Sequence, residues 1–107
     1  MKLTEERKAE VLALCKKLVS NRSYSGEENA VADVLKCFMR QKQFDDFCTD
    51  KYGNVIGKIK GDRTGNKVLF DGHMDTVPAD NKEAWKHDPF VPLVEDGKLY
   101  GRGTSDM

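Results

Sequence analysis

The segment KVLFDGHMDTVP, residues 67–78, decides the fold that we predict for the rest of the chain. Its apolar run, VLF, stops abruptly at a group of polar residues, Asp71, His73 and Asp75. A short apolar run with such boundaries is typical of a buried strand, here residues 67–72. Because open α/β folds bind their ligands at the carboxyl ends of strands, we predict the functional site at the end of this strand.

Two helices are predicted before this strand. Apolar residues recur every three or four positions over residues 4–21, and Thr4 is a suitable N-cap. A second helix is predicted to start at Ser25, because Ser25 and Glu28 have the spacing of a capping box. Glu27 and Glu28 then lie in the first helical turn, so we interpret them as helix-terminal charges and not as a catalytic pair.

Short strands are predicted before and after residues 67–72. Residues 44–49 and 55–60 read as two strands joined by a turn. A hairpin is predicted over residues 93–100, because an Asp-Gly pair between apolar runs accepts the positive φ angles of a type I′ turn. The chain therefore combines two helices with several short strands, which indicates an α/β class.

The composition excludes several classes of function. Lys plus Arg and Asp plus Glu both total 18 and are interspersed, so no basic patch indicates nucleic acid or a membrane surface. The charged N-terminus does not resemble a signal peptide, and no apolar run approaches the roughly 20 residues of a membrane span. The cysteines, Cys15, Cys37 and Cys48, form no disulfide framework, so we expect a cytoplasmic protein.

His73 and Asp75 are the first candidates for a site. In an extended backbone, residues two apart point to the same face, so an imidazole and a carboxylate would stand side by side. A metal-binding histidine usually donates its second ring N–H to a carboxylate or carbonyl. Gly101 and Gly103 predict a tight turn that delivers the carboxylate of Asp106, which suits a carboxylate-bridged metal pair. The alternative is a surface histidine near a solvated aspartate.

Several motifs in order along the chain resemble the N-terminal part of the M20 metallopeptidases. This family includes acetylornithine deacetylase, succinyl-diaminopimelate desuccinylase, carboxypeptidase G2-type enzymes and aminoacylases. The motifs that carry the resemblance are HMDTVP at 73–78, WKHDPF at 85–90, EDGKLYGRG at 95–103 and SDM at 105–107, with further likeness over 23–35 and 50–61.

The resemblance implies a fold, a reaction and roles for three residues. The fold is a mixed α/β sheet flanked by helices, and the reaction is hydrolysis of amide or peptide bonds in small N-acyl amino acids or peptides by metal-activated water. His73 would ligate zinc, Asp75 would orient His73 as a catalytic residue, and Asp106 would bridge two zinc ions. Cobalt and manganese are the alternative metals.

The same resemblance implies that groups needed for catalysis lie outside residues 1–107. Members of the family continue past the bridging aspartate to a Glu-Glu pair, which supplies a general base and a ligand, then to another acidic ligand and a second histidine. We therefore expect an inactive N-terminal portion of a catalytic domain, without the lid domain through which a homodimer would form. Two alternatives stay open: a non-catalytic α/β binding module, and a fragment that binds one metal weakly.

Two other residues near the motifs are interpreted as structural. His87 lies in the long loop predicted over residues 76–92, where Trp85 and Phe90 are expected to anchor the chain by packing. Arg102 could meet a substrate carboxylate or hydrogen-bond neighbouring loops, and we favour the structural role.

Overall fold

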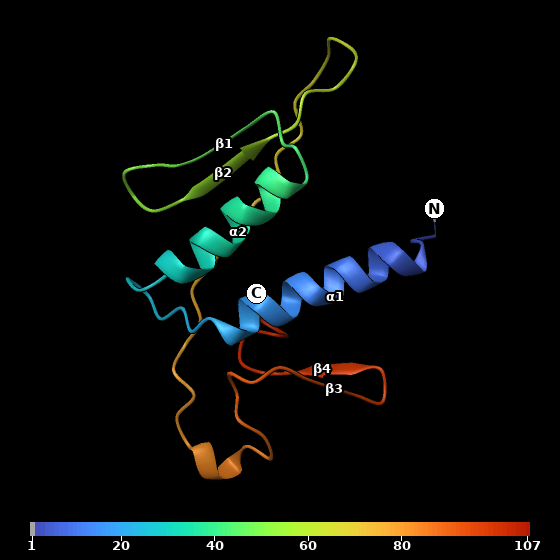
Figure 1. Ribbon diagram of the computed structural model, residues 1–107. Helices are drawn as coiled ribbons and strands as arrows, with labels where there is room; N and C mark the ends of the chain where they lie inside the picture. The colour runs from blue at the N-terminus through green and yellow to red at the C-terminus, as the bar shows by residue number, and fades with distance from the viewer. Residues whose placement is uncertain (1) are drawn as a thin grey trace.

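The computed structural model describes residues 2–107 and contains two helices and two separate two-stranded antiparallel sheets (Figure 1). The α/β class is confirmed, but the four strands within the described residues do not join into one mixed sheet. The elements are α1 (Glu5–Ser20), α2 (Asn29–Gln41), β1 (Asp46–Thr49), β2 (Val55–Lys58), a 3-10 turn η1 (Lys82–Ala84), β3 (Leu93–Glu95) and β4 (Lys98–Tyr100).

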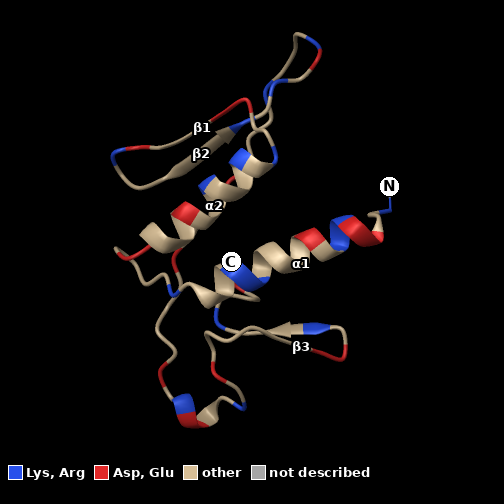
Figure 2. Cartoon of the chain, in the orientation of Figure 1, with Lys and Arg blue, Asp and Glu red and all other residues tan. Residues whose placement is uncertain are grey.

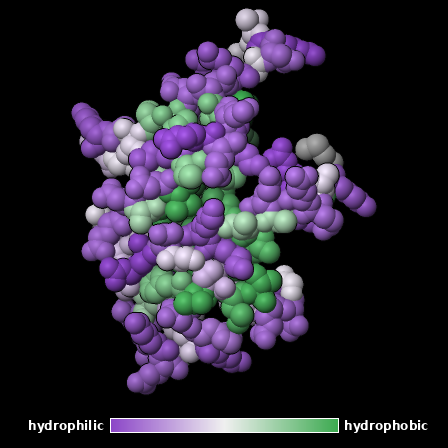
Figure 3. Space-filling view, in the orientation of Figure 1, coloured by the Kyte–Doolittle hydropathy of each residue, from purple (hydrophilic) through white to green (hydrophobic). Residues whose placement is uncertain are grey.

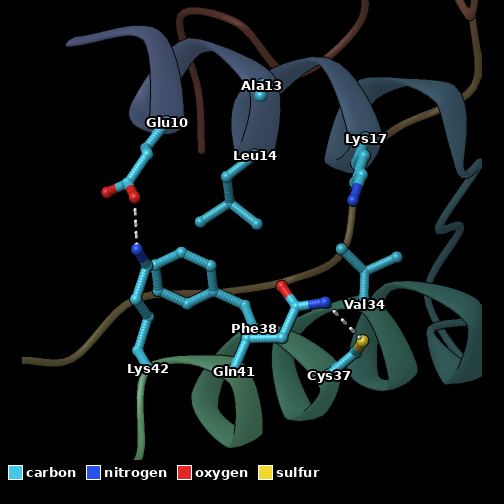
Figure 4. A pocket seen from close by; sticks show the side chains of 9 residues that line it. All are labelled: Glu10, Ala13, Leu14, Lys17, Val34, Cys37, Phe38, Gln41 and Lys42. Carbon is cyan, nitrogen blue, oxygen red and sulfur yellow. Dashed lines mark hydrogen bonds and ion pairs between the residues drawn. The ribbon is translucent and has the colours of Figure 1, made fainter. Parts of the chain in front are cut away.

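Helix α1 forms almost as predicted. The Thr4 hydroxyl accepts a hydrogen bond from the Arg7 backbone N–H at 3.2 Å, so the predicted N-cap is confirmed. Figure 4 shows Leu14 of α1 and Phe38 of α2 pointing into an apolar cavity of about 260 Å³ between the helices. An ion pair between Glu10 and Lys42 spans one end of this cavity. The interface therefore combines apolar packing with a partly exposed salt bridge.

The capping box predicted at Ser25 is wrong, because α2 begins four residues later, at Asn29. Gly26 has a φ of +89°, a left-handed conformation that interrupts a helix and that glycine adopts at little cost. The Glu28 carboxylate accepts a hydrogen bond from the Gly26 N–H at 2.8 Å. The Ser25 hydroxyl bonds instead to Asp75, 50 residues away in the sequence. A tertiary contact thus replaces the local cap.

The first hairpin confirms the predicted strand pair, with shorter strands. β1 pairs with β2 in an antiparallel register that places Phe47 opposite Gly57. The turn between them is fixed by Asp50, whose carboxylate accepts hydrogen bonds from the backbone N–H groups of Tyr52 and Asn54, both at 2.9 Å. This hairpin packs against α2, as Figure 1 shows.

The buried strand predicted at residues 67–72 is wrong. The segment belongs to no sheet, and the residues Val68, Leu69 and Phe70 are 78%, 88% and 92% exposed. A strand forms only when a neighbour satisfies its backbone groups, and no part of the described residues pairs with this segment. The radius of gyration, 15.7 Å, also exceeds the value of about 13 Å usual for a compact domain of this length.

The second hairpin confirms the type I′ turn that the sequence predicts. Asp96 and Gly97 have φ angles of 50° and 73°, and β3 pairs with β4 from Leu93–Tyr100 to Glu95–Lys98.

The surface of the molecule is mixed in polarity. Figure 3 shows hydrophobic surface over both helices and over the hairpin of β3 and β4, with hydrophilic surface around it. Figure 2 shows charges of both signs along the helices. Among the described residues, no helix has the length and apolar character needed to cross a membrane.

Candidate functional site

His73 lies between two acidic residues that come from different parts of the chain. Its Nδ1 is 2.9 Å from the backbone oxygen of Asp75 and 3.3 Å from the Oδ1 of the same residue. A carbonyl oxygen can only accept a hydrogen bond, so Nδ1 carries a proton. The other ring nitrogen, Nε2, is 2.9 Å from the Oδ1 of Asp106. The structure therefore brings together all three predicted site residues.

The turn after β4 carries Asp106 to this position. Gly103 has a φ of +88°, and a Cβ on it would lie 2.9 Å from the Thr76 side chain. Glycine is therefore required both by the backbone conformation and by the close approach to Thr76. The Thr104 hydroxyl donates to the Gly101 carbonyl at 3.0 Å and closes the turn. The tight turn predicted from the two glycines is confirmed.

Arg102 fastens the same turn to the long loop before β3. Its backbone N–H donates to the Pro89 carbonyl at 2.7 Å, and its guanidinium donates to the Pro78 carbonyl at 3.3 Å. The guanidinium carbon also lies 5.1 Å from the centre of the Trp85 ring, a cation–π contact. These contacts are those of the structural role that we favoured from the sequence.

Ser25 is the member of the site that the sequence did not reveal. Its hydroxyl donates a hydrogen bond to the Oδ2 of Asp75 at 2.6 Å. Two residues earlier, the Ser23 carbonyl accepts a hydrogen bond from the Thr76 N–H at 2.7 Å. The connector between α1 and α2 is thereby bonded to residues 75 and 76. The capping-box spacing masked this role, because it offered Ser25 a plausible local partner.

The remaining candidates lie outside this cluster. Glu27 forms an ion pair with Arg22 at 3.3 Å, and Glu28 bonds to the Gly26 N–H. His87 lines a separate cavity near Trp85 and Tyr100. The thiols of the three cysteines are free, and Cys37 and Cys48 are exposed. These residues are therefore no part of the His73 cluster.

Hydrogen bonds shift the pKa values of His73 and Asp75, and each shift favours the charged form of the residue. The Asp106 carboxylate bonded to Nε2, aided by the Asp75 carbonyl, raises the pKa of His73. The Ser25 hydroxyl, with a smaller contribution from His73, lowers the pKa of Asp75. The raised pKa of His73 favours its protonated form, and the lowered pKa of Asp75 favours its carboxylate form. A metal ion binds neutral imidazole, so a metal at Nε2 would have to displace a proton.

Comparison with known proteins matches this part of the chain to a family. Residues 69–107, which include His73, Asp75 and Asp106, match the family described as peptidase family M20/M25/M40. The chain is therefore similar to this family over the segment that holds the site. Curated relatives extend the likeness over 90% or more of the chain, and no solved structure matches it.

The similar relatives are bacterial enzymes that are much longer than this chain. It is 32% identical to an N-formyl-4-amino-5-aminomethyl-2-methylpyrimidine deformylase of Bacillus subtilis, over 99% of this chain and 27% of the relative. It is 34% and 37% identical to succinyl-diaminopimelate desuccinylases of Cupriavidus necator and Ralstonia nicotianae, over 90% of this chain and 27% of each relative. The chain thus spans about a quarter of the length of these relatives.

The residues of the His73 cluster have donor atoms that suit a metal ion, and they supply part of a ligand set. An imidazole nitrogen and a carboxylate oxygen are donors that zinc accepts. The side chains of His73 and Asp106 are 46% and 92% exposed, and a cavity of about 600 Å³ opens beside them. Within residues 2–107, no group of three or more His, Cys, Asp or Glu side chains could hold a metal. A catalytic zinc usually has three protein ligands, so these two donors fit an incomplete site.

Proposed function

We propose that this chain contributes His73, Asp75 and Asp106 to the metal centre of a hydrolase that cleaves amide bonds in small N-acyl compounds or peptides. One observation carries the proposal: the His73 Nε2 and the Asp106 Oδ1 converge to 2.9 Å at the mouth of an open cavity. The M20 relatives support it, because their names denote removal of formyl and succinyl groups.

Each residue has a distinct role in this proposal. His73 and Asp106 would be ligands of zinc, of which the complete site would hold two ions. Asp75 holds the His73 ring through Nδ1, which would leave Nε2 free to bind the metal. Bound zinc would supply the Lewis acid that activates water and polarises the amide carbonyl.

We also propose that these 107 residues do not complete the catalytic centre by themselves. The two donors fall short of the usual three, and the chain spans about a quarter of the length of its relatives. The further ligands and the general base would come from residues outside these 107. The lid domain, through which a homodimer would form, would also lie outside them. We expect the isolated chain to be inactive on N-formyl and N-succinyl amino acids in the presence of zinc.

Zinc titration with matched histidine variants tests the metal centre. The chain has two histidines, so His87→Ala is a natural control for His73→Ala. We expect weak zinc binding by the wild type and by His87→Ala, and none by His73→Ala or Asp106→Asn, as measured by isothermal titration calorimetry. Equal zinc binding by all four proteins would overturn the proposed centre.

A second candidate function is that of a non-catalytic α/β binding module. The exposed side chains of Val68, Leu69 and Phe70 favour it, because an unpaired apolar segment is a template for strand addition. The exposed surface, 9016 Å², also exceeds the value of about 6000 Å² usual for a monomer of this mass. Size-exclusion chromatography with light scattering tests this candidate. A monomer that unfolds cooperatively and does not self-associate would argue against it.

A further inference from the structure

Ser25 occupies a position in the cluster that neither its sequence context nor the roles of the other residues explain. Its hydroxyl donates to one oxygen of Asp75, Oδ2, at 2.6 Å. The other oxygen of Asp75, Oδ1, lies 3.3 Å from the His73 Nδ1. The two oxygens of one carboxylate are thus divided between a hydroxyl and an imidazole. Rotation of the Asp75 side chain would disturb both contacts together.

The backbone on both sides of Ser25 is fixed. On one side, Ser23 is 2% exposed and its carbonyl accepts the Thr76 N–H at 2.7 Å. On the other side, the left-handed Gly26 donates its N–H to the Glu28 carboxylate at 2.8 Å. The Ser25 hydroxyl is therefore presented to Asp75 from an anchored loop, which reduces the conformational entropy that the hydrogen bond costs.

We propose that Ser25 is a positioning residue of the metal centre, a role that rests on the proposed function. By holding Oδ2, Ser25 sets the orientation of the Asp75 carboxylate and keeps Oδ1 beside the His73 Nδ1. The ring is then held from the Nδ1 side by this oxygen as well as by the Asp75 backbone carbonyl at 2.9 Å, and Nε2 faces Asp106 and the open cavity. Partners of this kind, one step removed from the metal ligands, fix the orientation of the ligand ring.

A merely structural role for Ser25 makes different predictions. If the hydroxyl only tied the α1–α2 connector to residues 75 and 76, its removal would lower stability and leave the Asp75 side chain in place. Nuclear magnetic resonance on the metal-free chain separates the two roles. Three-bond couplings to the Asp75 Cγ report the side-chain rotamer directly, without any metal.

We expect one Asp75 rotamer in the wild type and rotamer averaging in Ser25→Ala. Ser25→Thr, which retains the hydroxyl, should restore the single rotamer. Ser20→Ala is the matched control, because the Ser20 hydroxyl donates only to the Lys16 carbonyl within α1. Averaging of the Asp75 side chain over several rotamers in the wild type would overturn the proposal, even if Ser25→Ala failed to fold. A single rotamer in a folded Ser25→Ala would overturn it as well.

Zinc titration of the same variants tests the consequence for the metal centre. We expect Ser25→Ala to weaken zinc binding about tenfold, as is typical when a partner of a ligating histidine is lost. Ser25→Thr should recover most of the affinity, and Ser20→Ala should bind as the wild type does. Equal weakening in Ser25→Ala and Ser20→Ala would overturn the positioning role. Absence of zinc binding by the wild type would refute the proposed function, and the couplings would still decide whether Ser25 orients Asp75.

Discussion

The two halves of residues 67–78 differ sharply although they are adjacent in the chain. In the first half, Val68, Leu69 and Phe70 are largely exposed, and the segment belongs to no sheet. In the second half, His73 and Asp75 bond to Ser25 and Asp106, and the Thr76 N–H bonds to the Ser23 carbonyl. The difference shows that an apolar run acquires structure only from a partner, whereas polar groups with specific partners are held even near the surface.

The largest expected effect compares a buried side chain with an exposed one. Val31 in α2 is 5% exposed, and Leu69 is 88% exposed. We expect Val31→Ala to lower the free energy of unfolding by about 2 kcal/mol, through lost burial and a residual cavity. Leu69→Ala should change it by less than about 0.5 kcal/mol. Urea denaturation followed by circular dichroism measures both, and a large loss in Leu69→Ala would mean that this segment is packed in solution.

The next largest effect concerns the turn that brings Asp106 next to His73. Gly103→Ala should lower the free energy of unfolding by about 1–2 kcal/mol, because Ala is strained at a positive φ. The added Cβ would also press against Thr76 and shift Asp106 away from His73. Gly65→Ala is the control, since nothing lies within 4 Å of its Cβ position. Urea denaturation gives the stabilities, and unchanged His73 ring nitrogen shifts in Gly103→Ala would contradict the predicted displacement.

Hydrogen exchange compares the two halves without any mutation. The Thr76 amide donates to the Ser23 carbonyl at 2.7 Å and should exchange slowly. The amides of Val68, Leu69 and Phe70, outside any sheet, should exchange at nearly the rate of an unstructured peptide. Exchange followed by nuclear magnetic resonance measures each amide, and comparable protection of both halves would remove the contrast between them.

The smallest effect is a pH dependence in the hairpin that precedes this segment. The Asn54 side-chain amide, aided by backbone N–H groups of the turn, lowers the pKa of Asp50 in the folded chain. The stabilisation by Asp50 is therefore complete above its unfolded pKa and is lost as the pH falls through its folded pKa. We expect Asp50→Asn to reduce the acid-induced loss of stability, measured by urea denaturation across that range. An identical pH profile in the variant would contradict the assignment.

The elements predicted well from the sequence are those specified by neighbouring residues. The Thr4 N-cap, the periodicity of α1 and the Asp96-Gly97 turn all act within a few residues, so local pattern predicts them. The strand predicted at residues 67–72 fails for the opposite reason, because a strand needs a partner from elsewhere in the chain. The capping box predicted at Ser25 fails for a related reason, since the Ser25 hydroxyl bonds to a residue 50 positions away and not to its local partner.

The sequence alone determined the kinds of chemical group in the site, and the tertiary structure determined how they meet. His73, Asp75 and Asp106 could be selected because an imidazole and two carboxylates near strand and turn boundaries suit metal chemistry. Only the folded chain brought Ser25 to Asp75 and Asp106 to the His73 Nε2, across 50 and 33 residues of sequence. Such contacts depend on how separate elements pack against one another, and a pattern among neighbouring residues does not predict that packing.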